Sequence, residues 1–163
     1  MKLWLLLALA LPAPLAAQDA PAVPAPACQA QDADLPGPLA AWRRPTAAGT
    51  LLRPGQAVQL MLRPVVGATT IVPPHASHDG GAQTVGQIAL EIGSAGTYRV
   101  ALESGAWVDL LQESRSLPSI SHGHGPACST IRKIVDFQLA PGRYQLQISG
   151  TTAAGIRLLV IPR

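Results

Sequence analysis

Short runs of alternating apolar and polar residues, separated by glycine and proline, dominate the chain from Leu51 onward. The first complete run, QAVQLMLR, places Val58, Leu60 and Leu62 on one side of an extended segment. Because successive side chains of a strand point to opposite faces, each such run predicts a strand with one buried face. Four later runs give further sets that would share the buried face: Ile88, Leu90 and Ile92; Tyr98, Val100 and Leu102; Val135, Phe137 and Leu139; Tyr144, Leu146 and Ile148.

The spacing of these runs indicates the fold class. They follow one another at intervals of roughly ten residues, and no long amphipathic helical pattern interrupts them. We therefore predict an all-β fold, an antiparallel β-sandwich or jelly-roll-like domain of about seven to nine short strands. A helix is an alternative only around residues 38–44.

Two segments echo each other within this pattern. GTYRVALESG and GRYQLQISG both contain a glycine, a tyrosine two residues later and then alternating apolar positions. We expect each tyrosine ring to pack inward while its hydroxyl reaches the rim of the core. Either convergent hairpin sequences or a duplication would explain the match.

The N-terminus has the order of a secretory signal peptide. Lys2 precedes an apolar run from Leu3 to Leu11, and small residues follow at Ala16 and Ala17. Prolines interrupt the run well short of the roughly 20 apolar residues that a membrane-spanning helix needs. We therefore predict a signal peptide at residues 1–17, no transmembrane span, and a periplasmic or secreted product.

Composition divides the remainder into two parts. Residues 18–50 are rich in alanine and proline and begin as an extended lead-in, whereas residues 51–163 carry the β-sandwich pattern. The net charge is +3, and the basic residues are scattered without a basic and aromatic face. We therefore expect no nucleic-acid partner.

Cys28 and Cys128 are the two cysteines of the chain. In an exported protein a pair of cysteines predicts a disulfide, because oxidising compartments preserve it. Closing a loop of about 100 residues would contribute up to about 4.7 kcal/mol in the chain-entropy model. The bond would also remove Cys128 from metal chemistry.

The four histidines form two close pairs, His75 and His78 in PPHASHDGG and His122 and His124 in SHGHGPAC. Imidazole nitrogen is a common ligand for zinc, copper and iron, and residues two apart in a strand share a face. We therefore consider a site for iron, copper or zinc at His122 and His124, with the first pair and the carboxylate of Asp109 as further candidates. The alternatives are ordinary polar loop residues, or donors to backbone carbonyls near the disulfide.

Trp107 is a candidate ligand contact. Alternation along AWVDLLQ predicts that it shares a face with Asp109, whose carboxylate would then need a partner such as Arg99 or Arg132. Tryptophan can offer a flat surface to a sugar or another small molecule, although a core position is the common alternative. Motifs for nucleophilic catalysis and for phosphate binding are absent from the sequence.

Residues 104–150 contain a Gly-Ala-Trp-Val-Asp run, the turn HGHGPACS, the strand RKIVDF and the hairpin start PGRY. In these features the chain resembles small exported proteins of Gram-negative bacteria that carry the name homogentisate dioxygenase. The resemblance implies a metal-dependent dioxygenase with iron held by two histidines and one acid, here His122 and His124 with one carboxylate. The text PGRYQLQISG is also similar to bacterial pre-peptidase C-terminal β-sandwich domains, which implies a binding or accessory module.

Two functions therefore remain open from the sequence. The first is an exported binding or envelope accessory module, with a small molecule or an envelope protein as its partner and a His-lined metal site. The second is the metal-dependent dioxygenase. An enzyme of that type needs an open coordination position within a pocket, whereas an accessory module needs only a surface patch.

Overall fold

The computed structural model describes residues 28, 30–77 and 80–163, and the predicted signal peptide lies outside these residues. Within the described residues the chain forms twelve strands and one 3-10 helix, which confirms the predicted all-β sandwich class. Seven of the strands have five or more residues; the other five have two or three. None of the described helical residues form a helix long and apolar enough to cross a membrane.

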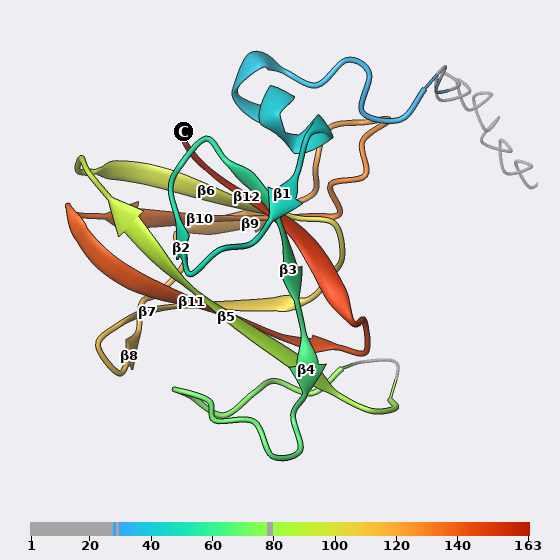
Figure 1. Ribbon diagram of the computed structural model, residues 1–163. Coiled ribbons are helices and arrows are strands. Elements are labelled where there is room, and N and C mark those ends of the chain that lie inside the picture. The colour runs from blue at the N-terminus through green and yellow to red at the C-terminus, as the bar shows by residue number, and fades with distance from the viewer. Residues whose placement is uncertain (1–27, 29, 78–79) are drawn as a thin grey trace, which may run out of the picture.

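The strands form two facing sheets (Figure 1). The first sheet has the order β1 (Thr46–Ala47), β3 (Ala57–Met61), β12 (Gly155–Pro162), β6 (Gly96–Leu102), β10 (Lys133–Leu139) and β9 (Ser121–Gly123). The second has the order β2 (Leu51–Leu52), β5 (Thr84–Ile92), β11 (Gly142–Thr151), β7 (Trp107–Gln112) and β8 (Arg115–Ser116), and β4 (Arg63–Pro64) also pairs with β5. The pairs β1–β3 and β2–β5 are parallel, and the other pairs are antiparallel.

The main core lies between the two sheets. It contains all five sets of alternating residues that the sequence predicts to face inward, from Val58, Leu60 and Leu62 to Tyr144, Leu146 and Ile148. Burying one such side chain contributes roughly 1.5–3 kcal/mol relative to leaving it in water. The period-two pattern therefore accounts for the register of the long strands.

The two echoed tyrosines make the same local contact. The hydroxyl of Tyr98 donates to the carbonyl oxygen of Ser94 over 2.9 Å, and the hydroxyl of Tyr144 donates to that of Ala140 over 2.9 Å. Both rings are buried in the main core. Each ring thus packs inward, as the sequence predicts. Its hydroxyl also satisfies a carbonyl four residues earlier, a contact that the sequence analysis did not predict.

A second apolar cluster covers the outer face of the first sheet. The 3-10 helix η1 (Gly37–Arg43) lies within the proline- and alanine-rich lead-in and contributes Leu39 and Trp42. The indole Nε1 of Trp42 donates to Thr130 Oγ1 over 2.8 Å. The loop before β10 contributes Ile131. The sheet contributes the outward apolar residues that pack against them: Ala57, Ala101, Ile134, Leu159 and Ile161. Because β12 is buried on both faces of the sheet, its sequence is almost continuously apolar.

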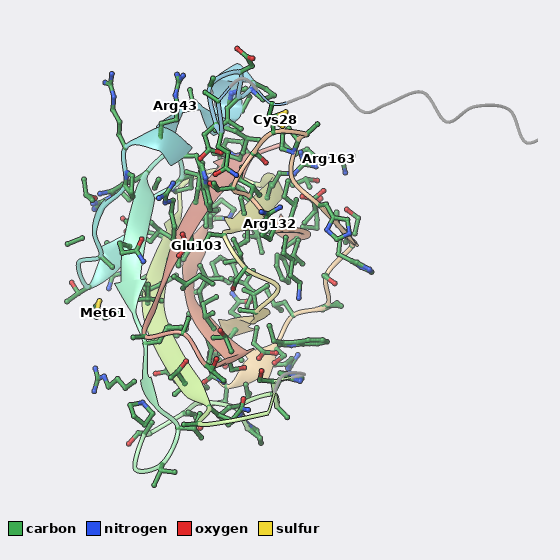
Figure 2. All side chains as sticks on the ribbon, turned by 90° about the vertical axis from the view of Figure 1, so that its right-hand side faces the viewer. Cys28, Arg43, Met61, Glu103, Arg132 and Arg163 are labelled. Atoms are coloured by element: carbon green, nitrogen blue, oxygen red, sulfur yellow. A yellow bond between two sulfur atoms is a disulfide. The ribbon has the colours of Figure 1, made fainter. Side chains whose placement is uncertain are left out.

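A disulfide joins Cys28 to Cys128, with an S–S distance of 2.07 Å and a Cα–Cα distance of 5.3 Å. Beside it, Asp32 accepts hydrogen bonds from the backbone N–H of Thr130 over 2.7 Å and from its hydroxyl over 2.6 Å. Figure 2 shows Cys28 at one end of the molecule. The covalent bond and the aspartate together hold the lead-in against the 124–132 loop.

Candidate functional site

A buried glutamine fixes the 71–77 loop on the outer face of the second sheet. Gln147 of β11 is fully buried, and its Oε1 accepts from the backbone N–H of Ile71 over 3.1 Å. The same oxygen accepts from Gln87 Nε2 over 2.8 Å, while Gln147 Nε2 donates to the carbonyl of Val72 over 2.9 Å. Because buried amides need partners, these bonds specify where the loop lies on the sheet.

The same loop brings His75 onto Trp107. The backbone N–H of His75 donates to Ser149 Oγ over 3.1 Å, and the imidazole stacks on the indole with ring centroids 4.1 Å apart. Gly150 has a φ of +67°, and a Cβ there would lie 3.4 Å from both the carbonyl oxygen of Ala76 and the Cβ of Trp107. A glycine is therefore suited to the close approach of loop and strand at this point.

Asp109 lies beside the stacked pair. Its Oδ2 is 3.6 Å from His75 Nε2, and Val108 and Leu110, the residues on either side of it, face the main core. Trp107 and Asp109 therefore share the outer face of β7, as alternation predicts. The side chain of Asp109 is 11% exposed and that of His75 is 41% exposed. Among the described residues no hydrogen-bond partner reaches the buried Oδ2 atom.

The structure corrects the partner expected for Asp109. The sequence offered Arg99 or Arg132, but Asp109 pairs with His75, and Arg99 forms its ion pair with Asp136 on the first sheet. Arg99 and Asp136 are opposite each other in the register of β6 and β10. Alternation identifies the face of a residue but not the sheet that a distant arginine joins.

Lys133 brings a positive charge to the same place from the first sheet. Its Nζ lies 5.1 Å from the centroid of the Trp107 ring and donates to the carbonyl of Ala106 over 3.0 Å. Partial burial lowers the pKa of Lys133 below its usual value. The Trp107 patch, defined as His75, Trp107, Asp109 and Lys133, thus combines an aromatic ring with three ionisable side chains.

Trp107 differs from the other aromatic residues that the structure describes. The other four, Trp42, Tyr98, Phe137 and Tyr144, are buried, whereas Trp107 is 45% exposed. A large aromatic ring kept at the surface beside polar groups is typical of a binding contact. A hollow of about 830 Å³ lies elsewhere, between β3 and β5, and none of the patch residues line it.

The second histidine pair lies at the edge of the first sheet. His122 is opposite Val135 in the register of β9 and β10. His124 follows the last residue of β9, and its Nδ1 lies 3.0 Å from the carbonyl oxygen of Arg132, so that this nitrogen carries the hydrogen. Because β9 ends at Gly123, strand alternation does not fix the direction of His124. Metal binding by this pair stays a prediction.

The described residues do not make up the iron site that the resemblance implies. That site needs two histidines and one carboxylate on the same ion. Within residues 28, 30–77 and 80–163, no group of three or more histidine, cysteine, aspartate or glutamate side chains lies in position to hold a metal ion. His78 lies outside the described residues. The dioxygenase activity stays a prediction from the resemblance alone.

Sequence reasoning missed Lys133, Gln147 and Ser149. Gln147 and Ser149 occupy outward positions of RYQLQIS, where the period-two pattern predicts solvent. Lys133 has no sequence relation to Trp107, because the two residues belong to different sheets.

No protein-family model and no curated protein sequence matches the chain.

Proposed function

We propose that the protein is an exported binding module of the cell envelope that holds a divalent transition-metal ion between His75 and Asp109. Export accords with the disulfide, because such bonds persist in the periplasm and outside the cell. A two-sheet sandwich with a covalently tethered lead-in is a rigid scaffold for a surface site. The ion would lie at the Trp107 patch.

The main support for this proposal is the position of Asp109 Oδ2. The 3.6 Å between His75 Nε2 and Asp109 Oδ2 is too long for a good hydrogen bond. Two ligands of one tetrahedral zinc ion, each about 2.1 Å from the metal, would lie about 3.4 Å apart. A small closing movement would therefore let both atoms bind one ion. Such an ion would also satisfy the buried oxygen, whose unmet hydrogen bonding otherwise costs about 1–3 kcal/mol.

The neighbouring groups are compatible with this ion. The backbone bond to Ser149 and the stacking on Trp107 fix the imidazole, so little freedom is lost when it binds. The Lys133 ammonium donates to the carbonyl of Ala106 over 3.0 Å and lies over the Trp107 ring, 5.1 Å from its centroid. The half-exposed imidazole leaves the other coordination positions open to water or to an external ligand.

Titration with Zn²⁺ tests the metal site. We expect one equivalent to bind by calorimetry, with a shift of the Trp107 indole NMR signal and little change in the signal of buried Trp42. His75→Ala and Asp109→Asn should each weaken binding at least tenfold. The matched control, His122→Ala with His124→Ala, should leave it unchanged. Absence of Zn²⁺ binding, or its loss only in the control variant, would show that this assignment is wrong.

Fractionation of a Gram-negative host tests export independently. The protein should appear in the periplasmic fraction, and mass spectrometry without reducing agent should show no free thiol. Protein retained in the cytoplasm with two free thiols would contradict the proposal of export while leaving the Zn²⁺ result interpretable.

A further inference from the structure

A groove of about 330 Å³ lies on the outer face of the first sheet, away from the Trp107 patch. Its walls come from the lead-in, from the loop after β9 and from the end of β12. Leu39, Ile134 and Ile161 contribute apolar side chains, and proline rings complete the walls. Ligand sites start at about 300 Å³, so the groove suits a small or slender molecule.

Basic groups line the same groove. Arg99, Arg163 and His124 all contribute to its lining. Two bonds, from Nε and Nη2, tie Arg99 to Asp136, and Arg163 Nη1 lies 3.3 Å from the same carboxylate. Two guanidinium groups therefore face one buried carboxylate, which leaves one positive side-chain charge in excess.

These groups are positioned before any ligand arrives. The backbone N–H of Arg163 donates to the carbonyl of Thr97 over 2.9 Å, and the Nδ1 of His124 is occupied by the carbonyl of Arg132. Figure 2 shows Arg163 toward the same end of the molecule as Cys28. The Arg163 side chain is 56% exposed, so its donors remain accessible to an anion. Preorganised donors lose little entropy when they bind.

We infer that this groove binds a carboxylate with an unbranched apolar body, such as a medium-chain fatty acid. The carboxylate would accept hydrogen bonds from Arg163 and Arg99, since guanidinium groups recognise carboxylates through paired donors. The apolar body would lie over Ile134, Ile161 and Leu39, where each buried methylene contributes about 0.8 kcal/mol. This inference does not depend on the metal site at His75 and Asp109.

Decanoate, below its micelle concentration, is the probe for this site, and decanol is the matched probe without the carboxylate. We expect saturable binding of decanoate by calorimetry at one equivalent, with decanol at least tenfold weaker. Amide NMR shifts should fall on the non-proline residues at the groove: Gly37, Leu39, His124, Gly125, Ile161 and Arg163. Equal binding of the two probes, or shifts confined to other residues, would overturn the inference.

Substitutions test the charge and the space separately. Arg163→Gln should weaken decanoate binding about tenfold while leaving the fold intact, because Asp136 keeps its bonds to Arg99 and Ser121. Arg143→Gln removes the same charge from an exposed position on the second sheet and should have no effect. Pro36→Trp should fill the groove and weaken decanoate and decanol alike. Equal losses in the two arginine variants would show a non-specific charge effect and overturn the inference.

Discussion

Arg99 and Asp136 face each other across β6 and β10 through two hydrogen bonds, from Nε to Oδ1 over 2.9 Å and from Nη2 to Oδ2 over 3.1 Å. The hydrogen bond from Arg99 is the main cause that holds the pKa of Asp136 below its usual value. The same bond raises the pKa of Arg99. Ser121 Oγ donates a third bond to Asp136, whose side chain is only 1% exposed.

This pair predicts a specific acid sensitivity. A carboxyl whose pKa is depressed by folding stabilises the protein above its unfolded pKa of about 3.9. That contribution is lost as the pH falls from this value through the lower pKa of the folded state. Urea unfolding should therefore show that the free energy of unfolding falls below about pH 4. Asp136→Asn should make this fall smaller, and it should also lower the free energy of unfolding at pH 7 by about 3 kcal/mol.

Glu91 provides the control for that experiment. Its ion pair with Arg53 is exposed at the surface, so Glu91→Gln should change the free energy of unfolding by less than about 1 kcal/mol. An Asp136→Asn variant as stable as Glu91→Gln at pH 7 would contradict the structural role of the Arg99–Asp136 pair.

The Cys28–Cys128 disulfide closes a sequence separation of 100 residues. We expect the double substitution to serine to lower the free energy of unfolding by about 2–4 kcal/mol, chiefly because the unfolded chain gains freedom. Urea unfolding of the wild-type protein with and without a reducing agent checks this. Identical midpoints in the oxidised and reduced states would contradict it.

Gly125 and Gly123, two residues apart in the HGHG segment, should respond differently to substitution by alanine. A Cβ at Gly125 would lie 2.5 Å from both the Cβ and the carbonyl oxygen of Ile131, so backbone would have to move. A Cβ at Gly123 would meet nothing within 4 Å. Gly125→Ala should therefore lower the free energy of unfolding by about 1–3 kcal/mol, as overpacking does. Gly123→Ala should leave it almost unchanged, and thermal unfolding compares the two variants. Equal effects would show that the loop does not pack as described.

Trp42 and Trp107 make a second matched pair. Trp42 is fully buried against the first sheet, and its indole donates a hydrogen bond to Thr130. Trp42→Ala should therefore lower the free energy of unfolding by about 3–5 kcal/mol. Trp107 is 45% exposed, and Trp107→Ala should cost far less stability. Chemical denaturation of the two variants compares them. A mild effect of Trp42→Ala would mean that the second apolar cluster contributes little to the fold.

The sequence predicted the main core well and the second apolar cluster poorly, for a physical reason. Alternation identifies residues such as Phe137 that face the opposite sheet, because that face is buried along the whole strand. It assigns Ile134, the neighbour of inward Val135, to the solvent side, whereas the lead-in covers that face. Burial of the second face depends on where a remote segment is tethered, and strand periodicity carries no information about that.

The sequence identified several residues of the candidate site, but it did not predict how they are arranged in space. The sequence analysis named three residues of the Trp107 patch as candidates: His75, Trp107 and Asp109. For a metal site, however, it favoured His122 and His124, which are closer together in the sequence. The contact between His75 and Asp109 requires a loop that Gln147 of β11 holds on the sheet, and the position of Gln147 in the sequence suggested ordinary solvent exposure. Long-range contacts of this kind are not encoded in local spacing.

The most direct test of the proposed metal site is X-ray absorption at the zinc edge of the protein loaded with one equivalent of Zn²⁺. We expect one imidazole nitrogen and oxygen ligands at about 2.0–2.2 Å, with the imidazole signal lost in His75→Ala. Two or more imidazoles, or a signal that is unchanged in His75→Ala, would contradict the proposed metal site.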